Sequence, residues 1–255
     1  MIRIVILGTG NIGSHLLAAF ENVSALEVVQ VYNRSFEGLN SIRFRGSKTT
    51  HLNELVDADC YIIAVPDDAV AKISDALPFE NRLVVHTSGS VALSELNPKN
   101  RRGVFYPLQT FSKNRKVYFN EIPFCLEASD QKDLEILKTM ARTISSSVHE
   151  IDSEKRKQLH LAAVFVCNFV NHLYQIGYEI TENNQIPFSI LKPLIKETAS
   201  KIERDSPMDM QTGPAKRNDT STMNKHIDLL DIPIQKDLYK LLSQAITETY
   251  GREKL

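Results

Sequence analysis

The feature that most constrains this chain is the segment VILGTGNIG near its N-terminus. It places Gly8, Gly10 and Gly13 in the pattern G-x-G-x-x-G, directly after a short apolar run and at the start of a helical pattern. The first glycine permits a tight turn, the second lets the backbone approach a pyrophosphate, and the third lets the helix pack closely on the strand. The phosphates would then meet the N–H groups of Asn11 and Ile12 at the positive end of the helix. The motif predicts a dinucleotide site, and the alternative is a tight turn that binds nothing.

The end of the next predicted strand, EVVQVY (27–32), indicates which dinucleotide is bound. NAD-binding chains usually carry an acidic residue there for the ribose 2′-hydroxyl, but this chain reads Asn33, Arg34 and Ser35. Arg34 can pair with a 2′-phosphate and stack on adenine, and Ser35 can donate a hydrogen bond. This tip favours NADP (NADPH) over NAD. The alternative for Arg34 is a solvated surface side chain.

Hydrophobic patterning divides the chain into two parts. Up to about residue 151, short apolar strands alternate with helices, which predicts an α/β fold with a mainly parallel, doubly wound sheet. We therefore expect a Rossmann domain over residues 1–152. After that point the strand signals stop, and the helical stretches break near prolines. We expect residues 153–255 to form an all-helical domain for substrate binding and dimerisation.

Composition limits the partners of the chain and its location. The 30 basic and 31 acidic residues leave no basic excess, so nucleic acid is not an expected partner. The apolar runs are shorter than a membrane span, and the N-terminal run continues into the glycine turn without a cleavage site. The 3 cysteines are odd in number and widely separated, and none pairs with a histidine at ligand spacing. These features predict a cytoplasmic protein with reduced thiols and neither a membrane segment nor a metal site.

Two segments are expected at the carboxyl ends of strands, where open α/β sheets bind ligands. In AVPDDAV (64–70), Val65 and Pro66 would turn the chain over the cofactor, near its ribose and nicotinamide. In HTSGS (86–90), Ser88 and Gly89 would offer a hydroxyl and a backbone N–H to a substrate carboxylate. The alternative for the second segment is a turn with no ligand.

A third segment, YPLQTF (106–111), also follows a predicted strand. Tyr106 and Gln109 are therefore expected within reach of the same pocket. Tyr106 fits equally a buried structural role.

The helical segment HLAAVFVCNFVNHL (160–173) carries polar residues along an otherwise apolar stretch. At about 100° per residue, Asn171 lies roughly 20° from His160, and Asn168 roughly 80°. His160 is a candidate proton donor, because histidine titrates near working pH. Asn168 would assist catalysis and Asn171 would bind substrate. The alternative is that the imidazole and the amides satisfy one another inside a helical core.

Two further features concern the helical part. The long predicted helix that begins at Ser153 is apolar around much of its circumference, which predicts a homodimer. The loop TGPAKRND (212–219) supplies Lys216 and Arg217, which would close over an anionic substrate or the cofactor. The alternative for this loop is simple solvation.

The chain resembles a known group of proteins in the order of its motifs. These are the glycine motif, the strand-end segments, the His160 helix and the TGPAKRND loop. They look like those of bacterial Rossmann-like oxidoreductases with a helical C-terminal domain of unknown function. That group is distantly related to pyrroline-5-carboxylate reductase, ketopantoate reductase and 3-hydroxyisobutyrate dehydrogenase.

The resemblance implies an NADP-dependent oxidoreductase that moves a hydride between NADPH and a small carboxylated carbonyl or imine. Ketopantoate-like and pyrroline-carboxylate-like molecules are the implied substrates. In the hydroxyisobutyrate and ketopantoate enzymes, a catalytic lysine precedes an asparagine by one helical turn, whereas this chain has His160 and Val164. This departure argues against a simple hydroxyacid dehydrogenase mechanism. It also leaves open a non-catalytic NADP-binding sensor or assembly protein.

Overall fold

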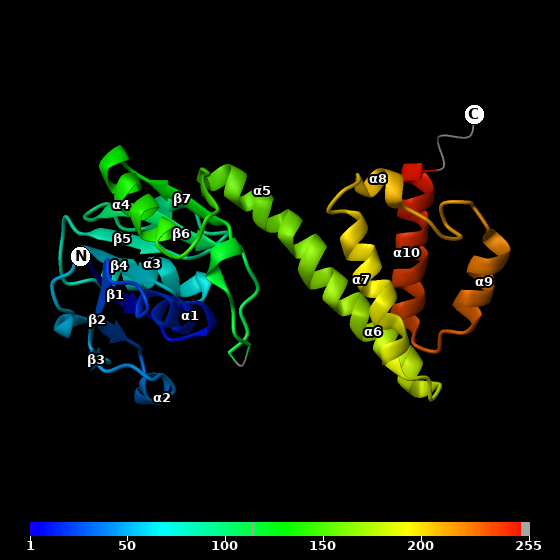
Figure 1. Cartoon of the computed structure of the whole chain (residues 1–255), viewed down its shortest axis with the longest axis horizontal. Coiled ribbons are helices and arrows are strands. Elements are labelled where there is room, and N and C mark those ends of the chain that lie inside the picture. The colour runs from blue at the N-terminus through cyan, green and yellow to red at the C-terminus, as the bar shows by residue number, and fades with distance from the viewer. Residues whose placement is uncertain (114, 251–255) are drawn as a thin grey trace. The chain divides into compact units, whose positions relative to one another are not determined.

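The computed structural model describes residues 1–113 and 115–250 (Figure 1). Its contacts divide the chain into two compact units, Met1–Val166 and Cys167–Leu255. We refer to the first as the sheet domain and to the second as the helical unit. Among the described residues, strands occur only in the sheet domain.

The sheet domain is built on one eight-stranded sheet in the order β3-β2-β1-β4-β5-β6-β7-β8. Neighbouring strands are parallel except β6 and β7, which are antiparallel. The strands are β1 (Ile2–Leu7), β2 (Leu26–Tyr32), β3 (Ser47–Thr49), β4 (Cys60–Ile63), β5 (Leu83–His86), β6 (Arg101–Pro107), β7 (Phe124–Ala128) and β8 (Val148–Glu150). The carboxyl ends of β1, β4, β5 and β6 therefore lie at one edge of the sheet.

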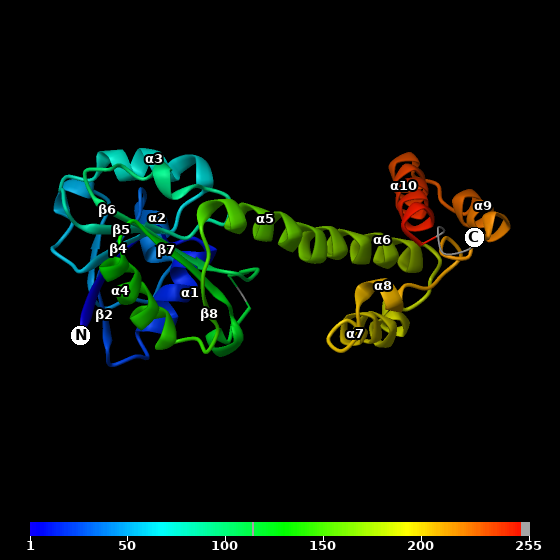
Figure 2. The ribbon, with the colours of Figure 1, turned by 90° about the horizontal axis from the view of Figure 1, so that it is seen from above.

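Helices cover both faces of this sheet, as Figure 2 shows. In β1, Ile4 and Ile6 pack on one face with helices α1 and α4, while Val5 and Leu7 pack on the other with α3. This alternation follows from the period of two in a strand. The helical segments of this domain are α1 (Asn11–Phe20), α2 (Phe36–Asn40), η1 (Leu52–Glu54), α3 (Asp67–Ala76), η2 (Leu93–Glu95), η3 (Phe119–Glu121), α4 (Gln131–Arg142) and α5 (Ser153–Ala163).

The doubly wound fold predicted from the sequence is confirmed. The short helix α2 is absent from the sequence prediction, because FEGLN has too few residues for a helical period to show. The contact division at Val166 falls later than residue 152, because the first turns of α5 pack on the sheet. Leu159 contacts the cluster formed by Val104, Tyr106 and Cys125. The domain boundary at 152 itself stays a prediction.

All regular secondary structure among the described residues of the helical unit is helical. A π-helical segment, η4 (Val164–Phe169), joins α5 to α6 without a break. The remaining elements are α6 (Val170–Asn183), η5 (Phe188–Leu191), α7 (Lys192–Lys201), α8 (Pro207–Met210), α9 (Thr220–Asp228) and α10 (Pro233–Tyr250). The prolines at 187, 207 and 233 stand at or just before helix starts, where a missing N–H costs nothing.

The continuous helix Ser153–Asn183 has 31 residues and meets the length and composition of a membrane span. The expectation that no apolar stretch reaches that length is therefore wrong for this segment. Length and composition alone are weak evidence for a membrane span, because helices of soluble proteins can have the same length and composition. The most apolar window of this helix is not buried in the structure.

The turn between β1 and α1 depends on close backbone approach. Gly8 has a φ of 112°, and a Cβ there would lie 2.3 Å from the carbonyl oxygen of Ala64. A Cβ on Gly13 would lie 2.0 Å from the carbonyl oxygen of Gly8. A Cβ on Gly10 would meet nothing within 4 Å. Two of the three glycines are thus required by packing, and Gly10 leaves open space above the turn.

This contrast predicts different effects for two alanine substitutions. Gly8→Ala is expected to lower the free energy of unfolding by about 3 kcal/mol or more, because it adds backbone strain and a clash. Gly10→Ala is its matched control and is expected to change that free energy by about 0.5 kcal/mol or less. Urea denaturation of both variants measures the difference, and similar losses in both would contradict this account of the turn.

Candidate functional site

The start of α1 has the geometry of a phosphate site. Gly10 is the N-cap residue and makes no side-chain hydrogen bond to the helix. The N–H groups of Asn11 and Ile12 in the first turn therefore lack a side-chain cap, and the space that a Cβ on Gly10 would occupy is open. Asn11 donates from Nδ2 to the carbonyl oxygen of Phe111 at 2.8 Å, so its side chain fixes the loop after β6. The turn fits the pyrophosphate of a dinucleotide.

The tip of β2 is shaped by its own side chains. Asn33 donates from Nδ2 to the hydroxyl of Thr9 and accepts from the backbone N–H of Ser35 at 3.1 Å. The Ser35 hydroxyl oxygen accepts from the N–H of Gly38 at 3.3 Å and caps α2. Arg34, between them, is exposed. Asn33 and Ser35 thus hold the tip in shape, while the guanidinium of Arg34 extends into solvent.

The loops after β4 and β5 are linked to one another. Val65 is half-buried and Pro66 is exposed at the N-cap of α3. Asp67, the next residue, accepts a short hydrogen bond from the hydroxyl of Ser90. A side-chain hydrogen bond therefore joins the two strand-end loops.

The β5 loop is largely closed by its own hydrogen bonds. His86 is fully buried and accepts at Nδ1 from the N–H of Ser88 at 3.1 Å. The Ser88 hydroxyl oxygen accepts from the N–H groups of Ser90 and Val91, at 3.1 and 3.0 Å. Ser88 is only 8% exposed. Because this oxygen already accepts two hydrogen bonds, the Ser88 hydroxyl can contact a ligand only by donating its hydrogen.

Three of the predicted site residues meet in the sheet domain. The hydroxyl of Tyr106, in β6, lies 3.1 Å from Nδ1 of His160, in α5. Their rings meet edge to face with centroids 6.1 Å apart. A Cβ on Gly89 would lie 2.6 Å from the same Nδ1, so the imidazole packs directly on the glycine backbone. His160 is half-buried here and lies against strand ends.

Arg156 is the residue that the sequence analysis missed. Its side chain is fully buried and pairs through Nη1 with Glu127 of β7. Nη2 donates to the carbonyl oxygen of Val91 at 2.5 Å and to the hydroxyl of Ser153 at 3.2 Å. Arg156 precedes His160 by one helical turn, so it fastens this part of α5 to the β5 loop and to β7. Its spacing of four from His160 was an available signal, but the run SEKRK offers no reason to choose it over its neighbours.

Burial and this guanidinium set the protonation of two neighbours. Burial, together with the charge of Arg156, lowers the pKa of His86 to about 3. Burial raises the pKa of Tyr106 to about 12. Near neutral pH, His86 is therefore uncharged and Tyr106 keeps its proton. His86 cannot act as a proton donor, whereas Tyr106 can donate its hydroxyl hydrogen.

The polar stripe predicted on the 160–173 helix does not keep its α-helical spacing. A π turn bonds residue i to i+5 and accommodates about one extra residue, so a residue after it is displaced by about 100° from an uninterrupted α-helical pattern. The angle expected for Asn171 relative to His160 is therefore wrong, and Asn168 lies inside the π-helical segment itself. Both amides are exposed and belong to the other side of the contact division. The structure does not group them with Tyr106 and Gly89.

Three other predicted residues are also outside this group. Gln109 is exposed and turns back on its own loop, where its Oε1 accepts from the N–H of Thr110 at 2.8 Å. Lys216 lies in the helical unit with its ammonium 5.6 Å from the ring centroid of Tyr250. Arg217 is exposed beside it.

The described residues contain no group of three or more His, Cys, Asp or Glu side chains arranged to hold a metal ion.

The buried neutral histidine predicts a specific dependence of stability on pH. An unfolded histidine takes up a proton near pH 6.5, whereas His86 in the native state does so only near pH 3. Between these values the unfolded state binds more protons, so the free energy of unfolding falls as the pH falls. At pH 5 this one residue should cost about 2 kcal/mol relative to pH 7.

The variant His86→Asn removes that titration and keeps an acceptor for the N–H of Ser88, as in an Asx turn. Denaturation of both proteins at pH 7 and pH 5 measures the effect. The wild type should lose about 2 kcal/mol more than the variant. Equal losses would show that His86 does not carry the dependence.

The two parts of the chain match two family models. Residues 3–89 match the model described as NADP oxidoreductase, coenzyme F420-dependent. Residues 122–246 match a domain of unknown function, DUF2520. A search of the curated proteins found no match.

Solved structures resemble the chain over nearly its whole length. A Bacteroides fragilis protein, provisionally named an NADP oxidoreductase, is 41% identical, with 97% of this chain and 98% of that one covered and a TM-score of 0.89. A Pseudomonas imine reductase is 15% identical, covers 98% and 94%, and has a TM-score of 0.69. A pyrroline carboxylate reductase from Plasmodium falciparum with NADP bound is 13% identical, covers 96% and 99%, and has a TM-score of 0.62. The last two show the fold alone. The 41% identity to the Bacteroides fragilis protein and the two family models together show the family. This chain belongs to the NADP oxidoreductase family in which a Rossmann domain precedes a helical DUF2520 domain.

Proposed function

We propose that this protein is an NADPH-dependent reductase of a small carboxylated carbonyl or imine. The observation that carries the proposal is the meeting of Gly89, Tyr106 and His160, which come from three separate segments. Two of them follow or end strands at the edge where doubly wound sheets bind ligands. Ketopantoate-like and pyrroline-carboxylate-like molecules are the substrates we expect. The hydrogen-bonded pair in this position favours an enzyme over a sensor that has lost turnover.

The bound cofactor would supply a hydride to the substrate carbon. The chain's own part is to deliver a proton to the carbonyl oxygen or imine nitrogen, so that a C=O or C=N bond becomes CH–OH or CH–NH. We assign the proton to Nε2 of the His160 imidazolium, whose Nδ1–H donates to the hydroxyl oxygen of Tyr106. Transfer of the Nε2 proton to the substrate leaves a neutral imidazole. The raised pKa of Tyr106, about 12, keeps its hydroxyl protonated, so this oxygen accepts from the imidazolium as a neutral group.

Cofactor binding in this proposal uses the residues around the glycine turn. Phosphates would be held by the backbone at Gly10, Asn11 and Ile12, where the open space lies. The exposed guanidinium of Arg34 would meet the 2′-phosphate that distinguishes NADP from NAD. The loop at Val65 and Pro66 would cover the nicotinamide ribose.

Substrate contacts are proposed at Ser88 and Gly89 in the sheet domain. The substrate roles of Gln109, Asn171, Lys216 and Arg217, and the catalytic role of Asn168, remain predictions from the sequence. We place the reaction in the cytoplasm.

We also infer a homodimer. Large apolar side chains are exposed on several helices, among them Leu161 at 53%, Leu194 at 63% and Leu241 at 64%. Exposed apolar surface on this scale marks an association surface in soluble proteins. Light scattering at micromolar concentration decides the matter, since a monomer has a mass of 28.8 kDa.

The first functional prediction concerns the choice of cofactor. Titration calorimetry should show that NADPH binds more tightly than NADH by about tenfold or more, because a charge-assisted contact to the 2′-phosphate contributes about 1.5–3 kcal/mol. Arg34→Ala should remove most of that difference. Arg142→Ala, an exposed arginine on α4, is the matched control and should leave it unchanged. Equal affinity of the wild type for the two cofactors would refute the assignment to NADP.

The second prediction concerns proton donation. With a panel of small keto acids and cyclic imino acids, His160→Ala should lower the rate of NADPH oxidation by about 10²–10⁴ and leave NADPH affinity nearly unchanged. Tyr106→Phe should also lower the rate, since the hydroxyl that orients the imidazole is lost. The exposed His149 provides the control variant His149→Ala, with normal turnover expected. If His160 is only structural, its removal would lower the melting temperature and spare the activity.

A further inference from the structure

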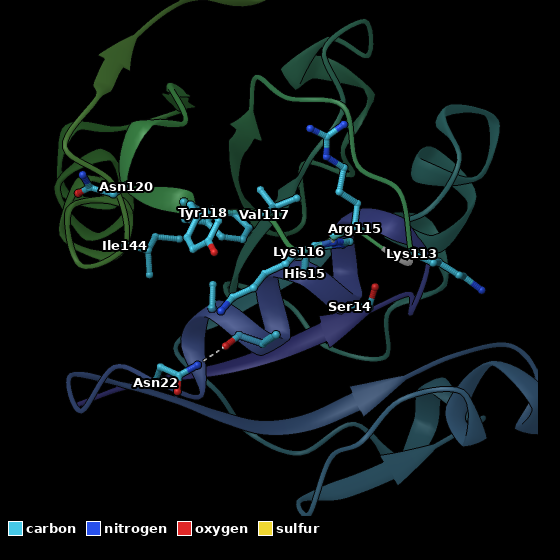
Figure 3. Close-up of a pocket in the computed structure, with 13 residues that line it drawn as sticks. Ser14, His15, Asn22, Lys113, Arg115, Lys116, Val117, Tyr118, Asn120 and Ile144 are labelled. Carbon is cyan, nitrogen blue, oxygen red and sulfur yellow. Dashed lines mark hydrogen bonds between the residues drawn. The ribbon is translucent and has the colours of Figure 1, made fainter. Parts of the chain in front are cut away.

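A groove runs along helix α1 of the sheet domain, apart from the Tyr106–His160 pair. One wall is α1 from Ser14 to Ala19 together with Asn22 just beyond the helix, and the other is formed by Lys113 and residues 115–120 between β6 and β7, as Figure 3 shows. Its volume is about 620 Å³, which is typical of a small-molecule site. The expected cofactor phosphates lie at Gly10 and Asn11, before the groove begins. The two sites therefore use different parts of the same helix.

The lining combines apolar side chains with unbalanced positive charge. The apolar part includes Val117 and Ile144. Lys113, Arg115 and Lys116 supply the charge, and the described residues that line the groove include no carboxylate. An apolar surface with a local excess of positive charge attracts organic anions.

His15 fixes one wall of the groove. Its Nδ1 lies 2.6 Å from the carbonyl oxygen of Asn11, and its Nε2 lies 3.0 Å from the carbonyl oxygen of Arg115. The ring also lies 5.3 Å from that of Phe111. The side chain of His15 thus joins the loop to α1.

Lys116 is the cation placed along the groove. Figure 3 shows its side chain lying along α1 in the direction of Asn22, while the side chains of Arg115 and Lys113 point in other directions. The Lys116 ammonium lies 5.2 Å from the ring centroid of Tyr118. An ammonium and an aromatic ring therefore stand next to one another at this part of the groove.

We propose that this groove binds a small organic anion, a carboxylate or phosphate monoester that carries an apolar body. Lys116 pairs with the anionic head, and the ring of Tyr118 and the side chains of Val117 and Ile144 contact the body. The same head-group chemistry is present in the phosphates of the cofactor. The experiment must therefore separate a second ligand from the dinucleotide.

Phenyl phosphate is the probe, titrated into the full chain carrying ¹³C-labelled Ala, Val and Ile methyl groups. We expect saturable shifts at the methyls of Ala18, Val117 and Ile144. Lys116→Gln should raise the dissociation constant by about tenfold or more, as expected for the loss of a charge-assisted contact. Lys72→Gln, on the exposed side of α3, is the matched control and should bind like the wild type.

Two further arms identify the ligand class. Benzyl alcohol, which is similar in shape and uncharged, should bind much more weakly than phenyl phosphate. Prior saturation with NADPH should leave the phenyl phosphate shifts in place. Displacement by NADPH would assign the groove to the dinucleotide and overturn the proposal. Equal binding of benzyl alcohol, equal affinity of Lys116→Gln, or the lack of saturable shifts at the three methyls would overturn it as well.

Discussion

The buried ion pair between Arg156 and Glu127 is the interaction on which the geometry of the candidate site depends. Removing two charges from water is costly, and their attraction compensates only when further hydrogen bonds complete the arrangement. Here the carbonyl of Val91 and the hydroxyl of Ser153 supply those bonds, although Nε of Arg156 has no protein partner among the described residues. Loss of Glu127 would leave the fully buried guanidinium of Arg156 without its counter-charge. The pair therefore fixes the position of α5 against β7 and the β5 loop, and His160 lies one turn further along the same helix.

That buried charge also separates the roles of two histidines. His86 lies inside the sheet, where burial and Arg156 lower its pKa to about 3, so it works as a neutral acceptor that shapes the loop of Ser88. His160 is half-buried and retains contact with solvent. Burial therefore gives His86 a structural role. His160 has the exposure and the partner, Tyr106, that the proposed proton donation requires.

The sequence predicted most of what depends on local pattern, and little of what depends on distant charges. The glycine turn follows from strand, turn and helix signals within a dozen neighbouring positions, and the packing at Gly8 and Gly13 agrees with it. Gly89 and Tyr106 were expected near the pocket because strand ends converge at one edge of a parallel sheet. The π turn was missed because an α-helical period was assumed throughout, and nothing in the pattern VFVCNF marks the extra residue. Arg156 was missed because its burial is set by Glu127, which is distant in sequence.

The π turn lies between two parts of the helix that are held by different surroundings. The candidate catalytic groups are divided between these two parts. Catalysis by a general acid needs its proton placed within hydrogen-bond reach of the substrate, and small displacements are costly. His160 stands before the π turn, on the part of the helix that Arg156 fastens to the sheet, whereas Asn168 and Asn171 are counted with the helical unit. The change of helical register therefore lies between the proposed proton donor and Asn171, and it separates the part of the helix that is fixed to the sheet from the part that belongs to the helical unit.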